Sequence, residues 1–205
     1  MLRVLTPPEP IVTPENVPGD HAGNDAYVKS VIAAVTQSIE GPTGWLNRAL
    51  GEQTLELVLC EFPHKVTLPC RPIIEIEEIT YLDAYGDAQV LDDGVYRHFG
   101  EALYHVAGRS LPSHLHSPDA VRIRYRAGYN GTPVADGGTG EVPDSAKHAI
   151  ILSAQHMLSL GAENLFLASE EVEGVGTTRY TVSDQAANLI ATTCDRLLQG
   201  LRVYA

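Results

Sequence analysis

The cysteines and histidines of this chain are the residues that could bind a metal ion. Cys60, His64 and Cys70 lie in one stretch of the sequence, and His114 and His116 could add further ligands. Zinc-binding sequences usually contain tightly spaced pairs such as Cys-x-x-Cys, whereas this spacing is irregular. We therefore interpret these residues as a buried thiol and surface histidines, and we expect neither a metal site nor a cofactor.

Three glutamates could supply the paired carboxylates of acid–base catalysis: Glu75, Glu77 and Glu78. Nothing near them in the sequence raises a pKa, and the solvated face of a strand explains them more simply. The glycine-rich run 137–140 lacks the lysine of a phosphate-binding loop, so we interpret it as an ordinary loop. A Gly-x-Ser-x-Gly nucleophile motif is also missing. We expect no catalytic residues and no enzymatic activity.

Three arginines alternate with apolar residues in the segment 121–126, namely Arg122, Arg124 and Arg126. Alternation with a period of two predicts a strand with one apolar and one cationic face. Neighbouring acids could make this an ordinary hydrated face. Alternatively, the three cations could contact an acidic surface of another subunit, which a chain of net charge −12 supplies if it self-associates. Both interpretations are structural.

A β-rich middle must carry these residues. The alternation of Leu55, Leu57 and Leu59 predicts a half-buried strand from Gln53, and the segment 73–82 predicts another. Its apolar residues change phase near Glu77–Glu78, which predicts a β-bulge. Turns are predicted at 83–87 and 92–94, and the arginine strand closes the region.

Helices are predicted on both sides of this middle. The segment 24–40 places five apolar residues on one face before Gly41-Pro42 ends the helix. A short helical piece at 45–50 follows. Five prolines within the first 18 residues predict an extended arm that is poorly paired by itself and lies along a neighbour or stays disordered.

Two further helices are predicted at the C-terminal end. One begins at Pro143 and ends near Gly161, and the other begins at an N-capping Ser183 and ends around Gly200. The segment 162–182 between them is predicted to be a loop. The expected apolar positions of the two helices are Ala146, Ala149, Ile150, Ala154 and Met157, then Leu189, Ile190, Cys194 and Leu197.

These elements predict an α+β fold, in which a small helical bundle contains an inserted antiparallel β region. We expect one domain over 1–205, with an extended proline-rich arm at 1–22, helical core and tail at 23–51 and 141–205, and the β insertion at 52–130. Three sparse cysteines are typical of a reducing compartment. The start lacks the long apolar run of a signal peptide, and no stretch has the composition to span a membrane. We expect a soluble protein that is cytoplasmic when made.

The charge balance bears on nucleic-acid binding. The chain has 14 Lys and Arg residues against 26 Asp and Glu residues. Tight binding to phosphates needs clustered cations, so this balance disfavours a protein that grips DNA. It is compatible with a protein that surrounds DNA without binding it.

The ordered set of these segments resembles the head–tail connector (adaptor) family of long-tailed bacteriophages and phage-derived gene transfer agents. The resemblance spans about nine-tenths of the chain. The segments that carry it are 6–13, 25–34, 39–44, 53–57, 62–63, 68–72, 79–86, Leu91, Tyr96, 125–129, 142–143, 149–152 and 197–203. Two places depart from the family pattern. Leu111-Pro112 replaces a Trp-Pro, and 159–163 replaces a Tyr-x-x-Arg, which leaves the local helix packing open.

The resemblance implies a structural virion protein at the capsid portal vertex, or neck, assembled in the host cytoplasm. Such proteins form a homo-oligomeric ring, typically of twelve subunits, that binds the portal protein and extends the DNA ejection channel. The ring provides a platform for the stopper or tail-terminator protein, and DNA passes through it without sequence-specific binding. An acidic channel wall would repel the DNA backbone, so we expect lumen-facing side chains to be mainly Asp, Glu and neutral polar residues.

We expect the segment 162–205 to contact the portal, because it follows a loop and ends in an apolar helix with two arginines. The complete set of expected subunit or portal contacts is Arg122, Arg124, Arg126, Arg196, Leu197, Leu198 and Arg202. Two other classes stay open at this point. One is a different ring component such as a stopper, although stoppers are typically β-barrels without terminal helices. The other is a small hydrolase, which would need converging carboxylates in a deep pocket.

Overall fold

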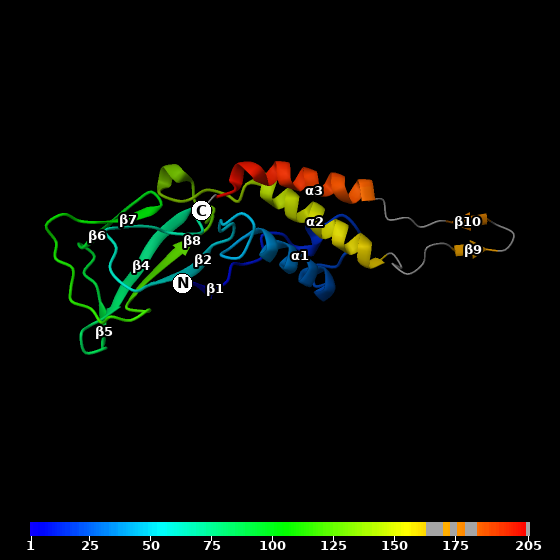
Figure 1. The fold of residues 1–205 in the computed structure, drawn as a ribbon. Helices are drawn as coiled ribbons and strands as arrows, with labels where there is room; N and C mark the ends of the chain where they lie inside the picture. Colours follow the sequence, from blue (N-terminus) through cyan, green and yellow to red (C-terminus); the bar gives the residue numbers. More distant parts are fainter. Residues whose placement is uncertain (163–169, 173–175, 179–183, 204–205) are drawn as a thin grey trace. The chain divides into compact units, whose positions relative to one another are not determined.

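The computed structural model of the chain describes residues 1–162, 170–172, 176–178 and 184–203. It is a mixed α+β structure with two compact units (Figure 1). Unit 1 comprises Met1–Glu9, Glu40–Val142 and Val203–Ala205, and carries the main β-sheets. Unit 2 comprises Pro10–Ile39 and Pro143–Arg202, and carries the α-helices. None of the described helices combines the length and apolar composition needed to cross a bilayer.

Unit 1 is built on a five-stranded antiparallel sheet in the order β1-β2-β8-β4-β5. These strands are β1 (Leu2–Thr6), β2 (Gln53–Leu59), β8 (Val121–Ala127), β4 (Ile73–Leu82) and β5 (Ala88–Val90). A three-stranded antiparallel sheet has the order β3-β7-β6, from β3 (Lys65–Thr67), β7 (Ala102–His105) and β6 (Tyr96–Phe99). The strand that closes the predicted region, β8, is therefore central in space.

The core of unit 1 lies on one face of the five-stranded sheet. In β8 the apolar phase of the predicted alternation is buried from Val121 to Ala127, and the arginine phase is not. Tyr125 is completely buried, and its hydroxyl donates a hydrogen bond to the Pro69 carbonyl at 3.0 Å. The alternation predicted from the sequence thus identifies which face of β8 packs inward.

Strand β2 differs from the half-buried strand that its alternation predicts. Its leucine phase is largely buried, but Glu56 and Val58 on the opposite face are buried as well. β2 is paired on both sides, with β1 and with β8, so side chains from two neighbouring strands flank its outer face. A period of two reports which residues share a face, and neighbouring strands decide whether that face is covered.

The predicted β-bulge in β4 is confirmed. The register of β4 against β8 shifts between Ile76 and Glu78, which leaves Glu77 as the extra residue. A second shift, between Ile73 and Glu75, was not predicted. The predicted turns are also confirmed. Asp83–Asp87 joins β4 to β5, and the Val95 amide bonds to the Asp92 carbonyl at 3.0 Å.

The first residues are not the poorly paired arm that the prolines predict. Leu2–Thr6 forms β1, which pairs antiparallel with β2 of the same chain. The prolines follow this strand instead of interrupting it, so its backbone donors remain available. Further along, Pro14–Asn16 is a 3₁₀ turn, and Val12, Pro14 and Val17 are buried.

The first helix of unit 2, α1 (Ala26–Ile39), closely matches its prediction. The Asp25 carboxylate caps it by accepting hydrogen bonds from the amides of Tyr27 at 2.9 Å and Val28 at 3.1 Å. Gly41 adopts a left-handed φ of 80° just after the helix, as a C-terminal stop requires. The short helix predicted at 45–50 is wrong, because the chain turns at 45–46, Asn47 has a φ of 49°, and Arg48 forms an isolated β-bridge with Arg71.

The remaining helices are α2 (Asp144–Ala162) and α3 (Asp184–Leu198), and α2 contacts both α1 and α3 (Figure 1). The small alanines predicted to form the apolar stripe of α2 are buried, as is Cys194 of α3. Met157 and Leu189 are exposed by 45% and 68%, so their assignment to the apolar stripes was wrong. Between the helices, β9 (Glu170–Val172) pairs antiparallel with β10 (Gly176–Thr178). The predicted cap Ser183 and most of the predicted loop lie outside the described residues.

Candidate interaction face

The outer face of the five-stranded sheet carries a row of alternating charges that runs across four strands. Arg3 of β1 is the register partner of Glu56 in β2, and Glu56 is the partner of Arg124 in β8. Arg124 is in turn the partner of Glu78 in β4. We call these four residues the charge row. Each cation in it therefore lies beside an anion of a neighbouring strand, and opposite charges on one face of a sheet attract.

Glu56 is the centre of the charge row. Its carboxylate lies 3.7 Å from the Arg3 guanidinium and 3.9 Å from that of Arg124, while Arg124 lies 4.0 Å from Glu78. The Glu56 side chain is only 8% exposed, whereas both arginines are nearly half exposed. A buried carboxylate needs compensating charge. The two flanking guanidinium groups supply it at distances longer than close hydrogen-bonded ion pairs.

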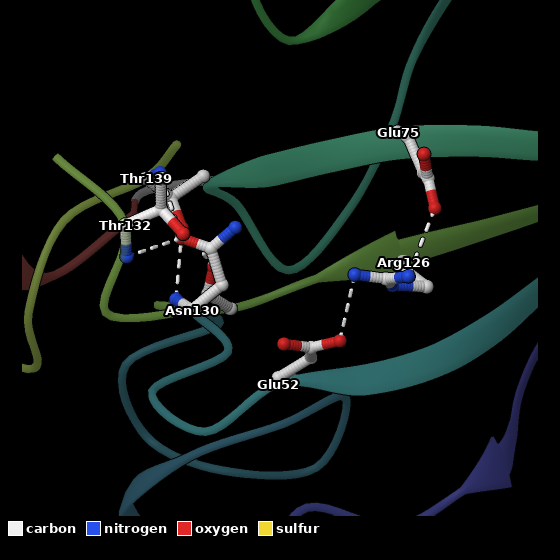
Figure 2. A network of polar contacts seen from close by, with 7 residues as sticks. Glu52, Glu75, Arg126, Asn130, Thr132 and Thr139 are labelled. Carbon is white, nitrogen blue, oxygen red and sulfur yellow. Dashed lines mark hydrogen bonds and ion pairs between the residues drawn. The ribbon is translucent and has the colours of Figure 1, made fainter. Parts of the chain in front are cut away.

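A second set of ion pairs lies beside the charge row. The Arg126 guanidinium bridges Glu52 at 2.8 Å and Glu75 at 3.0 Å, which connects β8 with β4 and with the residue that precedes β2 (Figure 2). Arg122 instead bonds Asp119 at 2.9 Å. A hydrogen bond from Ser117, followed by that from Arg122, lowers the pKa of the Asp119 carboxyl.

All three arginines of the predicted cationic face therefore have carboxylates of their own chain beside them. The β4 bulge at Glu77 contributes to this arrangement. Glu75 and Glu78 lie three positions apart along β4, yet they are register partners of Arg126 and Arg124, which lie two apart. The extra residue Glu77 absorbs the difference, so both acids face the arginines. Of the two interpretations of the arginines, the one with neighbouring acids describes the isolated chain.

The loop that follows β8 is held by a compact polar network (Figure 2). The Asn130 side-chain oxygen accepts hydrogen bonds from the amides of Thr132 at 3.1 Å and Thr139 at 3.0 Å. The Thr139 hydroxyl donates to the Gly128 carbonyl at 2.7 Å and accepts from the Asn130 amide. The glycine-rich run 137–140 lies in this self-bonded loop, in agreement with its interpretation as an ordinary loop.

One polar site was missed by the sequence analysis. Glu40 is buried, and one of its oxygens accepts hydrogen bonds from the amides of Leu50 at 2.7 Å and Gly51 at 3.0 Å. Burial raises the pKa of the Glu40 carboxyl, although these two hydrogen bonds oppose the rise. The acid follows the apolar stripe of α1 directly, but nothing local in the sequence marks it as buried.

The candidate chemical residues do not assemble into a reactive site. Burial, and then the charge of Glu40, raise the pKa of the Cys70 thiol to about 12, so this cysteine is a poor nucleophile. Cys60 is exposed. His114 stacks edge-on against Phe62 with ring centroids 5.2 Å apart. Within the described part of the chain, no group of three or more His, Cys, Asp or Glu side chains is arranged to hold a metal ion.

The expected contacts near the C-terminal end differ in exposure. Arg196 is exposed, and Leu197 and Arg202 are half-buried. Leu198 is 3% exposed and packs inside its own chain, so it offers no surface to a partner in this structure. The alternation of exposure along α3 explains the difference, because Leu198 follows Cys194 on the buried side of the helix.

Comparisons with known proteins give similarity at the level of the fold. No family model and no curated protein sequence matches the chain. Among solved structures, it is similar to a chain in the neck of a native gene transfer agent (GTA) particle computed with C12 symmetry, at 17% identity and a TM-score of 0.63. It is also similar to a chain in the neck of an empty GTA particle computed with C6 symmetry, at 18% identity and a TM-score of 0.64.

A third similar chain belongs to the virion of a native gene transfer agent particle, at 19% identity and a TM-score of 0.62. In each case the match covers 100% of this chain and 96% of the other. The alignment therefore spans both units. The chain has the fold of proteins found in GTA necks.

Proposed function

We propose that this chain is a head–tail connector, a structural protein of the neck of a phage-like particle. The observation that carries the proposal is the full-length structural match to chains of GTA necks, one of which was computed with C12 symmetry. The chain assembles into a ring under the portal protein, extends the DNA channel, and gives the stopper or tail-terminator protein a surface on which to bind.

The charges of the chain support passage of DNA rather than binding. The formal net charge is −12, and the three clustered arginines of β8 lie beside acids of the same chain. A ring wall built from such a surface repels phosphates. A subunit contact over the arginine face would exchange existing ion pairs for new ones, because the cations are already compensated.

Assembly with the portal protein tests this proposal. The purified chain is mixed with the portal protein of the same particle, and the mass and symmetry of the complex are measured by native mass spectrometry and electron microscopy. We expect a twelve-fold ring bound to the portal. A chain that stays monomeric in the presence of an intact portal contradicts the proposal.

The attachment to the portal is proposed to use the C-terminal segment, which includes α3 with the exposed Arg196. Deletion of residues 183–205 is expected to abolish co-sedimentation with the portal. Deletion of the exposed loop tip 133–136 in unit 1 is the matched control, and should leave attachment intact. Undiminished attachment of the variant without 183–205 would refute this part of the proposal.

A further inference from the structure

The strand β1 is attached to the rest of unit 1 through one edge only. It lies at the end of the five-stranded sheet and pairs with β2 through the register Leu2–Leu57, Arg3–Glu56 and Val4–Leu55. Its burial is slight. Leu2 is half-buried, and Val4 and Leu5 are each 43% exposed although both are large and apolar. Apart from the packing of Leu2 against the core of unit 1, most of what holds β1 is its backbone pairing with β2.

The chain that follows β1 is built to stay extended. Pro7, Pro8 and Pro10 follow the strand within four residues of its end. Proline fixes φ near the polyproline value, at a rise of about 3.1 Å per residue, so the segment 7–11 reaches roughly 15 Å. The buried residues Val12 and Val17 then fix the chain again in unit 2. A short, stiff linker at 7–11 thus joins β1 to the buried residue Val12.

The position of β1 on β2 is specified by charge as well as by pairing. Arg3 is the end of the charge row and lies 3.7 Å from the buried carboxylate of Glu56. A shift of register by one residue would turn the Arg3 side chain to the apolar face and leave Glu56 with Arg124 alone. The edge of β2 therefore selects one register of one strand, and that strand is β1 of this sequence.

We propose that β1 exchanges between neighbouring copies of this chain in the ring, so that β1 of each copy pairs with β2 of the next. The inference rests on the proposed connector function, which supplies the adjacent copy. Every contact of β1 with β2 is available unchanged in a neighbouring copy, because the acceptor edge is identical. Each copy gives one strand and receives one, which is a head-to-tail contact that a closed ring satisfies for every subunit.

Cysteine pairs distinguish exchange from pairing within the chain. Thr6 and Thr54 are register partners of β1 and β2 just beyond the register shift that follows Val4, and the Cα atoms of register partners in an antiparallel pair lie within disulfide range. One variant carries Thr6→Cys and a second carries Thr54→Cys, both with Cys60→Ser because Cys60 is exposed. The two variants are mixed unfolded, refolded together, assembled on the portal and oxidised. A disulfide between them forms only when β1 is donated in trans.

We expect disulfide-linked dimers from the mixed ring, and a ladder of higher oligomers from a ring of the Thr6→Cys/Thr54→Cys double variant. Each single variant alone is the control and should give monomers. A ring of the double variant that yields only internally linked monomers, or no Thr6–Thr54 disulfide at all, overturns the exchange and leaves the connector function standing. Failure to form any ring on an intact portal overturns both.

Discussion

Glu56 shows how a single buried charge can organise a surface. Its side chain is almost fully buried, and the guanidinium groups of Arg3 and Arg124 lie on either side of it. Removal of either cation would leave a buried carboxylate less compensated, and removal of the carboxylate would leave two cations facing each other. Glu78, at the end of the same charge row, is more exposed and has one cationic neighbour. The two acids therefore differ in environment although they lie in one row.

Neutralising these two acids should have unequal effects. We expect Glu56→Gln to lower the free energy of unfolding by about 1–3 kcal/mol, since a buried charge pair is broken. Glu78→Gln should change it by about 0.5 kcal/mol or less, as is usual for exposed ion pairs. Urea denaturation of both variants measures the difference. The difference between the two variants should persist in high salt, which screens exposed charges more than buried ones. Equal losses would contradict the assignment of Glu56 as the centre.

Glu40 should make stability depend on pH in an unusual direction for a carboxyl group. Burial raises its folded pKa above the ordinary 4.5, so the folded state holds the proton more tightly than the unfolded state. The resulting stabilisation is complete below about pH 4.5 and is lost as pH rises through the folded pKa. Glu40→Gln keeps an oxygen acceptor for the two backbone amides but does not titrate.

The stability of wild type relative to Glu40→Gln should therefore fall as the pH is raised from about 4.5 through the folded pKa. Urea denaturation at a series of pH values measures this difference directly. A difference that stays constant across the pH series would show that the Glu40 carboxyl titrates normally in the folded state.

At the scale of elements, β4 links sequence pattern to charge placement. Its bulge at Glu77 brings acids that are three positions apart opposite arginines that are two apart. Ile76 and Ile79 nevertheless both pack against the core of unit 1, because the extra residue is taken up between them. The bulge thus lets the isoleucines of β4 face the core while its glutamates face the arginines of β8.

Deleting the bulge residue should be tolerated better than deleting a regular one. Without Glu77 the register shift between Ile76 and Glu78 disappears, and Ile76, Glu78 and Thr80 keep their partners in β8. We expect the deletion of Glu77 to lower the free energy of unfolding by about 1–2 kcal/mol and to leave unfolding cooperative. Deletion of Thr80 should instead turn Tyr81 and the end of the strand to the opposite face. Thermal unfolding followed by circular dichroism compares the variants, and equal loss of cooperativity would show that the bulge itself is required.

Local sequence patterns predicted most helices and strands. The strand pairing and the burial that they did not predict depend on contacts between residues distant in sequence. The burial phase of β8, the bulge at Glu77 and the bounds of α1 follow from residues that are near one another in the chain. The pairing of β1 does not, because its partner β2 begins about fifty residues later. The exposure of Leu189 and the burial of Glu40 depend in the same way on which elements contact a helix or loop. Of the candidate site, the arginines were predictable and their acidic partners on other strands were not.

At the scale of the whole molecule, the acidic balance is the property most relevant to the proposed role in a DNA channel. The formal net charge of the chain is −12. The arginines on the outer face of the sheet lie beside carboxylates of the same chain, so they do not form an uncompensated cationic patch there. Such a surface suits a component that DNA passes without adhering.

The chain should therefore not retain DNA even at low ionic strength. We expect no retardation of a linear duplex in a gel-shift assay at about 50 mM salt, where phosphate contacts are strongest. The Glu52→Gln/Glu75→Gln variant, in which Arg126 loses both of its acidic partners, is compared with the wild type. This variant should bind the duplex no more than weakly. Retention of DNA by the wild type that weakens steeply with added salt would contradict a repelling surface.

The central position of β8 also has a consequence for synthesis on the ribosome. β2 ends at residue 59 and β4 at residue 82, yet both need β8, which is complete only at residue 127. At roughly 5–20 residues per second, the nascent chain holds the β8-facing edge of β2 unpaired for several seconds. The sheet can close only after this interval, and pairings so distant in sequence also make folding slow. During that time the unpaired edges of β2 and β4 favour association with the wrong partner.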